Sequence, residues 1–418
     1  NNLIILYSIK MSVFNEGYNK SNNFFIKGFN NLIIDSKNNK FVDLTSSGGT
    51  SLLGHNNTIL KRSLKKFVNS GFSNFALPNE HAKNFTKNIK KILPQFSKII
   101  FCNSGAEANL KAIRIARAVT NKDKIVNITG SWHGSLDQFL LYKDKKGKIK
   151  KLSDGLEKNI EKKIIYAPYN DLNKIIKIIE KYKDKICCVM IEPIQGCLPS
   201  YNGIEYLKSL NNYCKKKNII LILDEIISGL RTNCTTVQNK YHLSSDISTF
   251  GKVFGNSLPI GFIGITKKIE KIILNQKRNI FFGGTFSGNS LSMYVSNEFL
   301  KYVIKNKGKL FENLESKSLK LYNGLNNYIK QNNLKVNVIR FESIFRIIFS
   351  KDIPKDRLQR DFLEKKNNSN RLKFINYLNK KKIIFPSNGI IFLNNSFSSK
   401  DIDNLVKKIG HALRKFFS

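Results

Sequence analysis

The sequence predicts an α/β protein whose larger part is built on a mainly parallel central sheet, with a smaller α+β part beside it. Between about residues 99 and 265, short apolar strands alternate with helices, a pattern typical of parallel sheets. From about residue 292 onward the pattern is instead mixed α+β. Residues 24–44 place apolar stretches around two turn signals, which predicts a small antiparallel hairpin near the N-terminus.

Apolar runs and helical periodicity locate the individual elements. A helix is expected over Ala106–Val119, where one apolar stripe recurs at helical spacing, and a last helix is expected after Ser399 for the same reason. Loop 46–55 contains several glycines, and the polar patch 143–163 is expected to be a surface excursion or lid. The other expected helices are Leu172–Tyr182 and Ile204–Lys217, and the expected strands are Lys98–Cys102, Lys124–Ile128, Cys187–Ile191, Ile219–Asp224 and Gly261–Thr266.

Composition excludes several classes of protein. The chain has 418 residues, and its 41% of hydrophobic residues are enough for one large core or two linked ones. Its 24% of charged residues is an ordinary share for a globular protein and argues against wholesale disorder. No apolar run approaches the roughly 18 residues that span a bilayer, so we expect no membrane partner.

The net charge of +41 allows two interpretations. Lys and Arg together number 71 against 30 acidic residues, but only 11 of the 71 are Arg, the side chain favoured for bidentate phosphate and base contacts. The lysine excess also runs along the whole chain and accompanies many Asn and Ile residues. We interpret it as compositional bias from an A/T-rich coding sequence, and nucleic-acid binding is the alternative.

The cysteines and the N-terminus bear on the compartment. The six cysteines form no C-x-x-C pair, so we expect buried free thiols in a reducing cytoplasm and no metal site. The chain begins with Asn, and its first ten residues make a poor signal peptide because no basic residue precedes their apolar run. Met11 is therefore the expected start.

Two small-residue segments follow predicted strands, at the edge where open α/β sheets bind ligands. Residues 103–106, Asn-Ser-Gly-Ala, open a helix, where free backbone N–H groups and the helix dipole favour a phosphate. A plain tight turn is the alternative. Residues 130–134, GSWHG, carry the only tryptophan, Trp132, beside His133, and so offer a flat ring at a strand end. A packed core aromatic is the alternative.

Two charged residues stand in apolar surroundings at further strand ends. Asp224 ends the apolar run 219–223, and a buried acid needs a cation or hydrogen-bond donors. A structural salt bridge is the alternative. Lys252 stands among glycines and apolar residues in FGKVFGNSLPIG (250–261), a setting that favours a neutral, nucleophilic amine. A surface lysine is the alternative.

In this order, with 28 residues from Asp224 to Lys252, the segments resemble the class III (fold type I) pyridoxal-phosphate aminotransferases, in particular the glutamate-1-semialdehyde 2,1-aminomutase-like branch. The resemblance runs from about residue 24 to the C-terminus. It implies a small domain built from both termini (1–50 and 292–418) around a large cofactor-binding domain (51–291). The strings that carry it are FCNSGAEANLKAIRIARAV (101–119), GSWHG, EPIQG (192–196), LILDEIISGLR (221–231), GKVFGNSLPIG (251–261) and GGTFSGNSLSM (283–293).

The resemblance also implies catalytic roles. Lys252 would hold pyridoxal 5'-phosphate as an internal aldimine and, once displaced by the amino donor, move the proton between Cα and C4′. Asp224 would pair with the protonated pyridine nitrogen and keep the ring an electron sink. Arg231 is a candidate for binding a substrate carboxylate, and a structural role is its alternative.

The remaining site residues implied by the resemblance surround the cofactor. Trp132 would stack on the ring with His133 beside it, Ile226 would pack on the opposite face, and Glu192 would lie nearby. Thr285 would reach the phosphate bound by a neighbouring subunit, which implies a homodimer with shared active sites. The residues that would hold the phosphate within one subunit are Ser104, Gly105 and Ala106.

Two departures from the aminomutases guide the functional prediction. Gly48 and Thr50 stand where those enzymes carry Trp and Pro, and PSNGIIFLNNSF (386–397) lacks their C-terminal acid. The stretch 133–171 looks more like relatives that aminate sugars or small aldehydes. We therefore predict an aminotransferase that moves an amino group from a small-molecule donor to an aldehyde or keto acceptor. Glutamate-1-semialdehyde aminomutase is the alternative, and a catalytically idle binding protein or a nucleic-acid binder is disfavoured.

Overall fold

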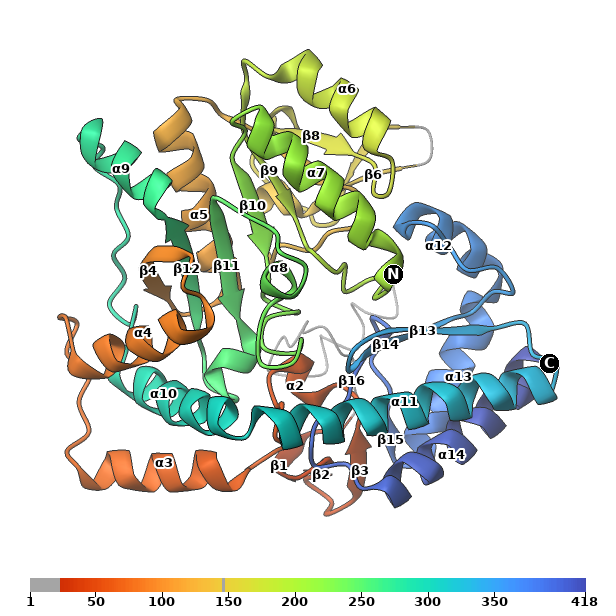
Figure 1. Cartoon of the computed structure of the whole chain (residues 1–418). Coiled ribbons are helices and arrows are strands. Elements are labelled where there is room, and N and C mark those ends of the chain that lie inside the picture. The colour runs from red at the N-terminus through yellow and green to blue at the C-terminus, as the bar shows by residue number, and fades with distance from the viewer. Residues whose placement is uncertain (1–22, 145–146) are drawn as a thin grey trace.

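The computed structural model describes residues 23–144 and 147–418, and the start expected at Met11 lies outside them. Within these residues a seven-stranded sheet has the order β4-β12-β11-β10-β9-β5-β8 (Figure 1). Strand β12 (Gly261–Thr266) runs antiparallel to its neighbours β11 (Ile247–Gly251) and β4 (Phe96–Cys102), and the other pairs are parallel. The predicted α/β class with a mainly parallel central sheet is confirmed.

Most strands lie where the apolar runs predicted them. The strands of the central sheet not yet introduced are β5 (Lys124–Ile128), β8 (Ile164–Ala167), β9 (Ile186–Ile191) and β10 (Leu221–Asp224). Strands β8 and β11 were not predicted. In β11, Ser248 and Thr249 interrupt the apolar run, yet both are buried. Tertiary packing, which strand periodicity does not report, decides their place.

Helices cover both faces of the sheet. On one face lie α5 (Gly105–Thr120) and α9 (Lys267–Asn275), and on the other lie α6 (Leu172–Tyr182) and α7 (Ile204–Lys216). Strand side chains alternate between the faces, so Ile222 packs on the α5 side while Leu221 and Leu223 pack on the α7 side. The predicted helices of this region are confirmed to within a few residues.

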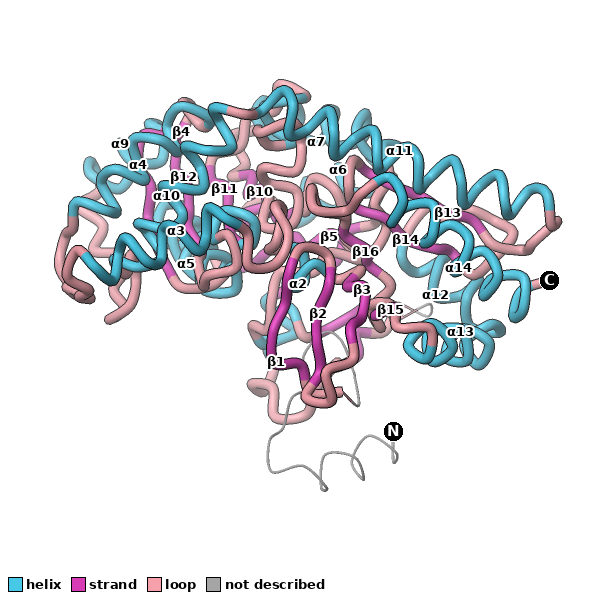
Figure 2. The backbone as a smooth tube through the Cα atoms, turned by 90° about the horizontal axis from the view of Figure 1, so that it is seen from below, coloured by secondary structure: helices cyan, strands magenta, loops and turns pink. Residues whose placement is uncertain are grey.

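The smaller part brings together the two ends of the described chain. Strands β1 (Phe25–Phe29), β2 (Leu32–Asp35) and β3 (Lys40–Asp43) form the predicted antiparallel hairpin with one strand more, and β15 (Ile383–Ile384) adds in parallel to β3 (Figure 2). A separate antiparallel sheet has the order β13-β14-β16. Its strands are β13 (Asn337–Phe341), β14 (Ile344–Ile348) and β16 (Ile390–Phe392), and the helices nearby are α11 (Lys307–Gln331), α12 (Arg357–Glu364), α13 (Asn368–Lys380) and α14 (Ser399–Phe417).

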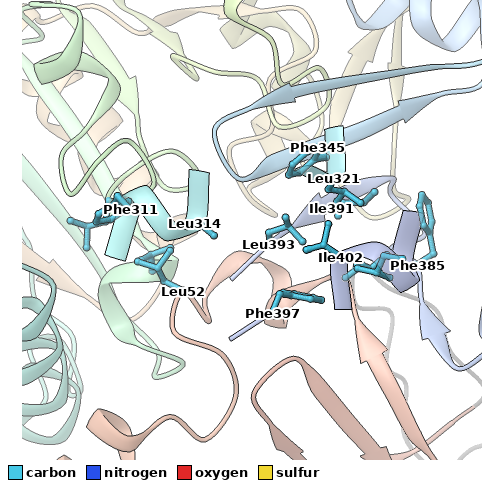
Figure 3. Packing of buried hydrophobic residues seen from close by; sticks show 14 of the residues in the cluster. Leu52, Phe311, Leu314, Leu321, Phe345, Phe385, Ile391, Leu393, Phe397 and Ile402 are labelled. Carbon is cyan, nitrogen blue, oxygen red and sulfur yellow. The ribbon is translucent and has the colours of Figure 1, made fainter. Parts of the chain in front are cut away.

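One apolar cluster connects this part with the central sheet. Figure 3 shows Leu52 beside Phe311 and Leu314, and Phe345, Leu393 and Ile402 further along the same cluster. The cluster extends to Phe254, two residues beyond Lys252. It therefore fixes the C-terminal strands against the segment that carries the lysine. Helices α3 (Thr58–Asn69), α4 (Glu80–Ile92) and α10 (Ser290–Lys305) pack together and contribute buried residues to the same cluster.

The remaining described segments include a hairpin and a short helix. The polar patch 143–163 begins in a hairpin of β6 (Leu141–Lys143) and β7 (Ile149–Lys151), and loop 46–55 contains the short helix α2 (Ser46–Gly49). All six cysteines are free, and five of them are buried. Across the described ranges, no helix is long and apolar enough to cross a bilayer, and no group of three or more His, Cys, Asp or Glu side chains is placed to hold a metal ion.

Candidate active site

The carboxyl ends of the parallel strands bring the predicted residues to one edge of the sheet. Asp224 ends β10, Lys252 follows β11, Glu192 follows β9, and the GSWHG loop follows β5. Strand β4 points the same way, because β12 is antiparallel to both β4 and β11, and it leads into the N-terminus of α5. Parallel strands thus gather at one edge residues that are up to about 150 positions apart in the sequence.

Asp224 is buried and held by donors on three segments. Its Oδ2 lies 2.8 Å from Asn109 Nδ2 and 2.7 Å from His133 Nδ1, and its Oδ1 accepts the backbone N–H of Ile226 at 3.1 Å. Asn109 is fixed in turn by the Thr249 hydroxyl, which donates to its Oδ1 at 2.7 Å. Among the described residues, Asp224 has no Lys or Arg ion-pair partner, and the alternative of a structural salt bridge rests on His133, whose Nδ1 lies 2.7 Å away and pairs with Asp224 as an ion only when protonated.

His133 contacts Asp224 through its ring Nδ1. Its side chain is buried, its ring packs edge-on to Phe139 at 4.9 Å, and its Nε2 has no hydrogen-bond partner among the described residues. Trp132, the preceding residue, lines a cavity together with Lys252, and its backbone N–H donates to Glu192 Oε1 at 3.3 Å. Adjacent residues of GSWHG therefore face different surroundings.

Lys252 opens a short 3₁₀ turn, Lys252–Gly255, directly after β11. Its φ of +46° lies in the left-handed region, which is unfavourable for a side chain with a Cβ and is often found at functional sites. The Nζ has neither a hydrogen bond nor an ion pair within the described parts of the chain. Burial lowers the pKa of this amine, opposed by the charges of Asp224 and Glu192 and assisted by Arg231. The alternative of a surface lysine does not hold.

Glu192 is a buried carboxyl group beside these residues. It accepts the backbone N–H of Gly196 at 3.0 Å as well as that of Trp132. Burial and the neighbouring charge of Asp224 raise its pKa to about 8. The side chain is therefore mostly protonated at pH 7.

The N-terminus of α5 is enclosed by tight backbone contacts. The Ser104 hydroxyl caps the helix by accepting the Glu107 N–H at 3.2 Å, and Gly105 and Ala106 begin its first turn. A Cβ on Gly105 would meet Ile226 Cδ1 at 2.6 Å, and a Cβ on Gly261 would meet the Ser104 carbonyl oxygen at 2.1 Å. These glycines allow β12 and the Asp224 loop to approach the helix end, where N–H groups are free to bind an anion.

A cavity of about 260 Å³ adjoins Lys252. Several of its wall residues were not predicted as functional, among them Arg346 of β14 and Arg357 and Arg360 of α12. One signal could have indicated them: four of only 11 arginines in this lysine-rich chain fall between 346 and 371. The full wall consists of Thr45, Gly48, Gly130, Trp132, Glu192, Gly196, Cys197, Ile227, Lys252, Arg346, Arg357, Arg360, Asn388, Ile390 and Phe392.

Of the predicted residues, only Trp132, Glu192 and Lys252 line this wall. Those outside it are Ser104, Gly105, Ala106, His133, Asp224, Ile226, Thr285 and Arg231. Ile226 packs over Gly105, and its neighbour Ile227 lines the cavity instead. Thr285 is exposed in a loop, and its backbone carbonyl accepts a hydrogen bond from Asn74 Nδ2 at 3.4 Å. Arg231 is buried, and its Nη atoms donate to Ser343 Oγ and to the carbonyls of Leu393 and Gly49 at 2.9–3.1 Å, so its hydrogen bonds join three chain segments. The structural role of Arg231 fits these contacts.

The comparisons with known proteins agree with this architecture. A family model described as aminotransferase class-III matches residues 13–413, and the chain belongs to this enzyme family. The glutamate-1-semialdehyde 2,1-aminomutase of Wigglesworthia glossinidia brevipalpis is 35% identical over 385 residues, which cover 90% of this chain and 85% of that one. The resemblance stated from the sequence is confirmed.

Solved structures share the fold at lower sequence identity. An omega-transaminase from Sphaerobacter thermophilus superposes with a TM-score of 0.88 at 20% identity, covering 99% of this chain and 96% of that one. A transaminase with PLP bound superposes with a TM-score of 0.84 at 19% identity, covering 99% and 97%. The fold of the whole described chain is thus that of the transaminases.

Proposed function

We propose that the chain is a pyridoxal-phosphate-dependent aminotransferase that moves an amino group from a small-molecule donor to an aldehyde or keto acceptor. The observation that carries this proposal is the convergence of Lys252, with its amine unpaired among the described residues, and buried Asp224 at one edge of the sheet. Membership of the family supports it, and so does the likeness to a transaminase with PLP bound.

The residues present fit this cofactor. A carboxylate offers about four lone-pair directions, and Asp224 uses three of them, which leaves one on Oδ1 for a ring N–H. The first turn of α5 offers Gly105 and Ala106 N–H groups and the positive end of a helix dipole for the phosphate. Trp132 supplies a flat ring in the wall of the cavity that Lys252 also lines.

Each of these residues has a defined task in the transfer. When bound, pyridoxal phosphate supplies an electron sink that stabilises a carbanion next to the substrate nitrogen. Asp224 keeps a proton on the ring nitrogen, and Asn109 and His133 hold that carboxylate in place. Lys252 Nζ takes the proton from the substrate carbon and returns it, for which burial prepares it by favouring the neutral amine. Trp132 and Glu192 line the cavity beside Lys252, where they would limit the access of water to the bound cofactor.

The cavity wall favours transfer between two molecules. Gly48 and Asn388 both line the cavity, and they fall in the segments where the sequence departs from the aminomutases. The second candidate is intramolecular transfer, as in glutamate-1-semialdehyde aminomutase, and it is favoured by the 35% identity to the Wigglesworthia enzyme. Conversion of glutamate-1-semialdehyde without an added donor or acceptor distinguishes the two.

The compartment and the oligomeric state of the enzyme are part of the same proposal. We propose a cytoplasmic homodimer with shared active sites, in which the exposed Thr285 reaches the partner's cofactor phosphate. Exposed apolar side chains near Thr285 support such an interface: Phe281 and Phe286 are 74% and 59% exposed, and Phe286 lines a hollow with Phe72. The net charge of +41 then attracts anionic substrates without nucleic acid being a partner.

The test is an absorbance spectrum of the purified protein with added pyridoxal phosphate, beside a Lys252→Ala variant. We expect a visible band that borohydride fixes to the peptide carrying Lys252, and no such band in the variant. Donor amino acids are then screened by bleaching of the band. A protein that binds no pyridoxal phosphate, or a band that persists without Lys252, would overturn the proposal.

A further inference from the structure

The cavity beside Lys252 has three arginines of the C-terminal part in its wall. We propose that Arg346, assisted by Arg357 and Arg360, binds an anionic group of the substrate, a carboxylate or a phosphoryl group. This inference rests on the proposed function and names the substrate class: amino donors or acceptors that carry such a group in addition to the reacting amine or carbonyl.

Arg346 is a buried cation with unused hydrogen-bonding capacity. Only 2% of the residue is exposed, yet it lines the cavity. Of its five N–H groups, Nη1 donates to the Asn388 carbonyl at 2.7 Å and Nη2 to Glu364 Oε2 at 3.5 Å. Its Nε has no acceptor within the described ranges. A buried guanidinium with free N–H groups gains from an anion that accepts from them.

The surroundings hold more positive than negative charge. The guanidinium groups of Arg346, Arg357, Arg360 and Arg371 share two nearby carboxylates, those of Asp361 and Glu364. Arg360 is itself committed to Asp361 and to the Cys197 carbonyl at 2.7 Å. The ion pair of Arg346 with Glu364 is long, at 3.5 Å. The four guanidinium groups exceed the two carboxylates by two charges, an excess that one phosphoryl group matches and one carboxylate halves.

The acid on the cavity wall does not offset this charge. Glu192 lines the same cavity, but burial and the charge of Asp224 raise its pKa to about 8, so it is mostly neutral at pH 7. Burial and the charge of Arg360 lower the pKa of Arg346 to about 9 although the charge of Glu364 opposes this shift, so a further counter-charge would stabilise the cation. A substrate anion supplies that counter-charge.

Glycines shape the wall around the arginines. A Cβ on Gly389 would lie 2.8–3.1 Å from the guanidinium atoms of Arg346, and a Cβ on Gly130 would lie 2.9 Å from Arg357 Cβ. Both glycines have φ values in the left-handed region, +82° and +99°. The backbone therefore lies directly against the arginines, and their positions are set by packing.

This site is separate from the one proposed for the cofactor phosphate. The cavity wall includes neither Ser104, Gly105 and Ala106 nor Asp224. Arg346 reaches the cavity from β14, in a different sheet from the strand that leads to Lys252. An anion on the arginines and a phosphate at the α5 N-terminus are therefore bound at different places, with Lys252 lining the arginine-bearing cavity.

Paired amines test the inference in the enzyme loaded with pyridoxal phosphate. The carboxylate arm compares 4-aminobutyrate with n-pentylamine, and the phosphoryl arm compares O-phosphoethanolamine with 2-methoxyethylamine. Apparent Kd and maximal rate come from bleaching of the visible band. We expect the wild type to prefer the anionic amine at least tenfold in one arm, and Arg346→Gln to lower that ratio at least tenfold through Kd more than through rate. The arm that responds identifies the anion.

A second readout does not depend on amino transfer. Trp132 is the chain's only tryptophan and lines the same cavity, so its fluorescence reports binding of glutarate or inorganic phosphate. We expect saturation in the loaded wild type and a Kd at least tenfold higher in Arg346→Gln. Arg357→Gln, at a side chain 30% exposed, provides a second variant expected to fold and to shift the same Kd.

The control is Arg340→Gln, because Arg340 lies on β13, pairs with Glu315 at 2.6 Å and does not line the cavity. It should leave both readouts unchanged. The inference is overturned if neither anion saturates the Trp132 signal, or if both arginine variants keep the wild-type ratio and Kd. Borohydride labelling of Lys252 in the same preparation reports separately on the proposed function, so its failure is distinguishable.

Discussion

The buried carboxyl of Glu192 makes the stability of the protein depend on pH. Its pKa of about 8 lies above its ordinary 4.5, so between these values the folded chain binds more protons than the unfolded chain. Stability therefore falls as pH rises through this window, by up to about 1.4 kcal/mol per pH unit for one group. Glu192→Gln removes this dependence. Urea unfolding at pH 5.5 and 7.5 should show the wild type losing roughly 2 kcal/mol more than the variant.

The control for that measurement is Glu205→Gln, whose side chain on α7 is 82% exposed. It should retain the wild-type pH dependence. If Glu192→Gln retained it too, the carboxyl would be ionised throughout the range, contrary to the expectation.

Asn109 is the residue on which the position of Asp224 most depends. Its amide donates to Asp224 Oδ2 and to the His133 carbonyl and accepts from Thr249, so Asn109→Ala leaves several buried groups unpaired. Each such group costs about 1–3 kcal/mol. We expect a lower Tm and a Kd for pyridoxal phosphate at least tenfold higher, measured by titration of the visible band. Asn313→Ala, on the exposed side of α11, should change neither quantity.

Single residues also mark what the sequence could and could not predict. Asp224 and Lys252 were singled out because a charged residue in apolar surroundings is a local pattern, whereas Glu192 was predicted only through the family resemblance. Asn109 lies beside the apolar stripe of α5, where its amide has no local signature, and its partners are 24 and 115 positions away. Arg346 reaches the cavity from another sheet. Contacts between elements far apart in the chain have no local sequence pattern to predict them.

At the level of elements, the spacing between β12 and α5 depends on one glycine. A Cβ at position 261 would meet the Ser104 carbonyl carbon and oxygen at 2.5 and 2.1 Å, and backbone cannot rotate away as a side chain can. Gly261→Ala must therefore displace the helix N-terminus, which costs about 1–3 kcal/mol in a packed interior. We expect a lower Tm and weaker binding of pyridoxal phosphate, both measurable on the purified variant.

Gly308→Ala is the matched substitution. A Cβ there would find only Glu312 Oε1 at 3.7 Å, and the position lies near the start of α11. Alanine should be neutral or stabilise the helix by up to about 1 kcal/mol. Equal losses from both glycine variants would contradict the role assigned to the close approach at Gly261.

The elements themselves were predictable to different degrees. Helices α5, α6 and α7 and most central strands follow from apolar periodicity, because their burial repeats along the chain. Strand β8 has a short apolar run beside a lysine-rich turn, and β15, of two residues, is defined by its pairing with β3. The pairing of the N-terminal and C-terminal strands is a property of the tertiary fold, and no local sequence pattern predicts it.

At the level of the whole molecule, the division into segments 1–50, 51–291 and 292–418 stays a prediction. Within the described chain, one apolar cluster runs from α4 through the turn after Lys252 to α14, and its packing couples the arginines of the C-terminal part to the lysine. Substrate recognition by one part and chemistry at the edge of the other then depend on the same packing.

The shared active site is tested by mixing subunits. Lys252→Ala alone should carry no borohydride-fixable label, and Thr285→Asp alone should bind pyridoxal phosphate weakly, because its carboxylate would face the phosphate of the partner's site. In a mixed dimer with Thr285 contributed across the interface, one site carries both changes and the other carries neither. Random exchange of equal amounts should therefore restore about a quarter of the wild-type label at limiting cofactor.

Light scattering provides the companion measurement, since the proposal requires a dimer of about twice 47.9 kDa. Restoration in the mixture, absent from either variant alone, means that each site takes residues from both subunits. Heterodimers that form without restoring the label would assign Thr285 to its own subunit, and a monomer would remove the basis of sharing. The exposed Phe281 and Phe286 beside Thr285 are the reason to expect restoration, because apolar side chains this exposed are stabilised when a partner covers them.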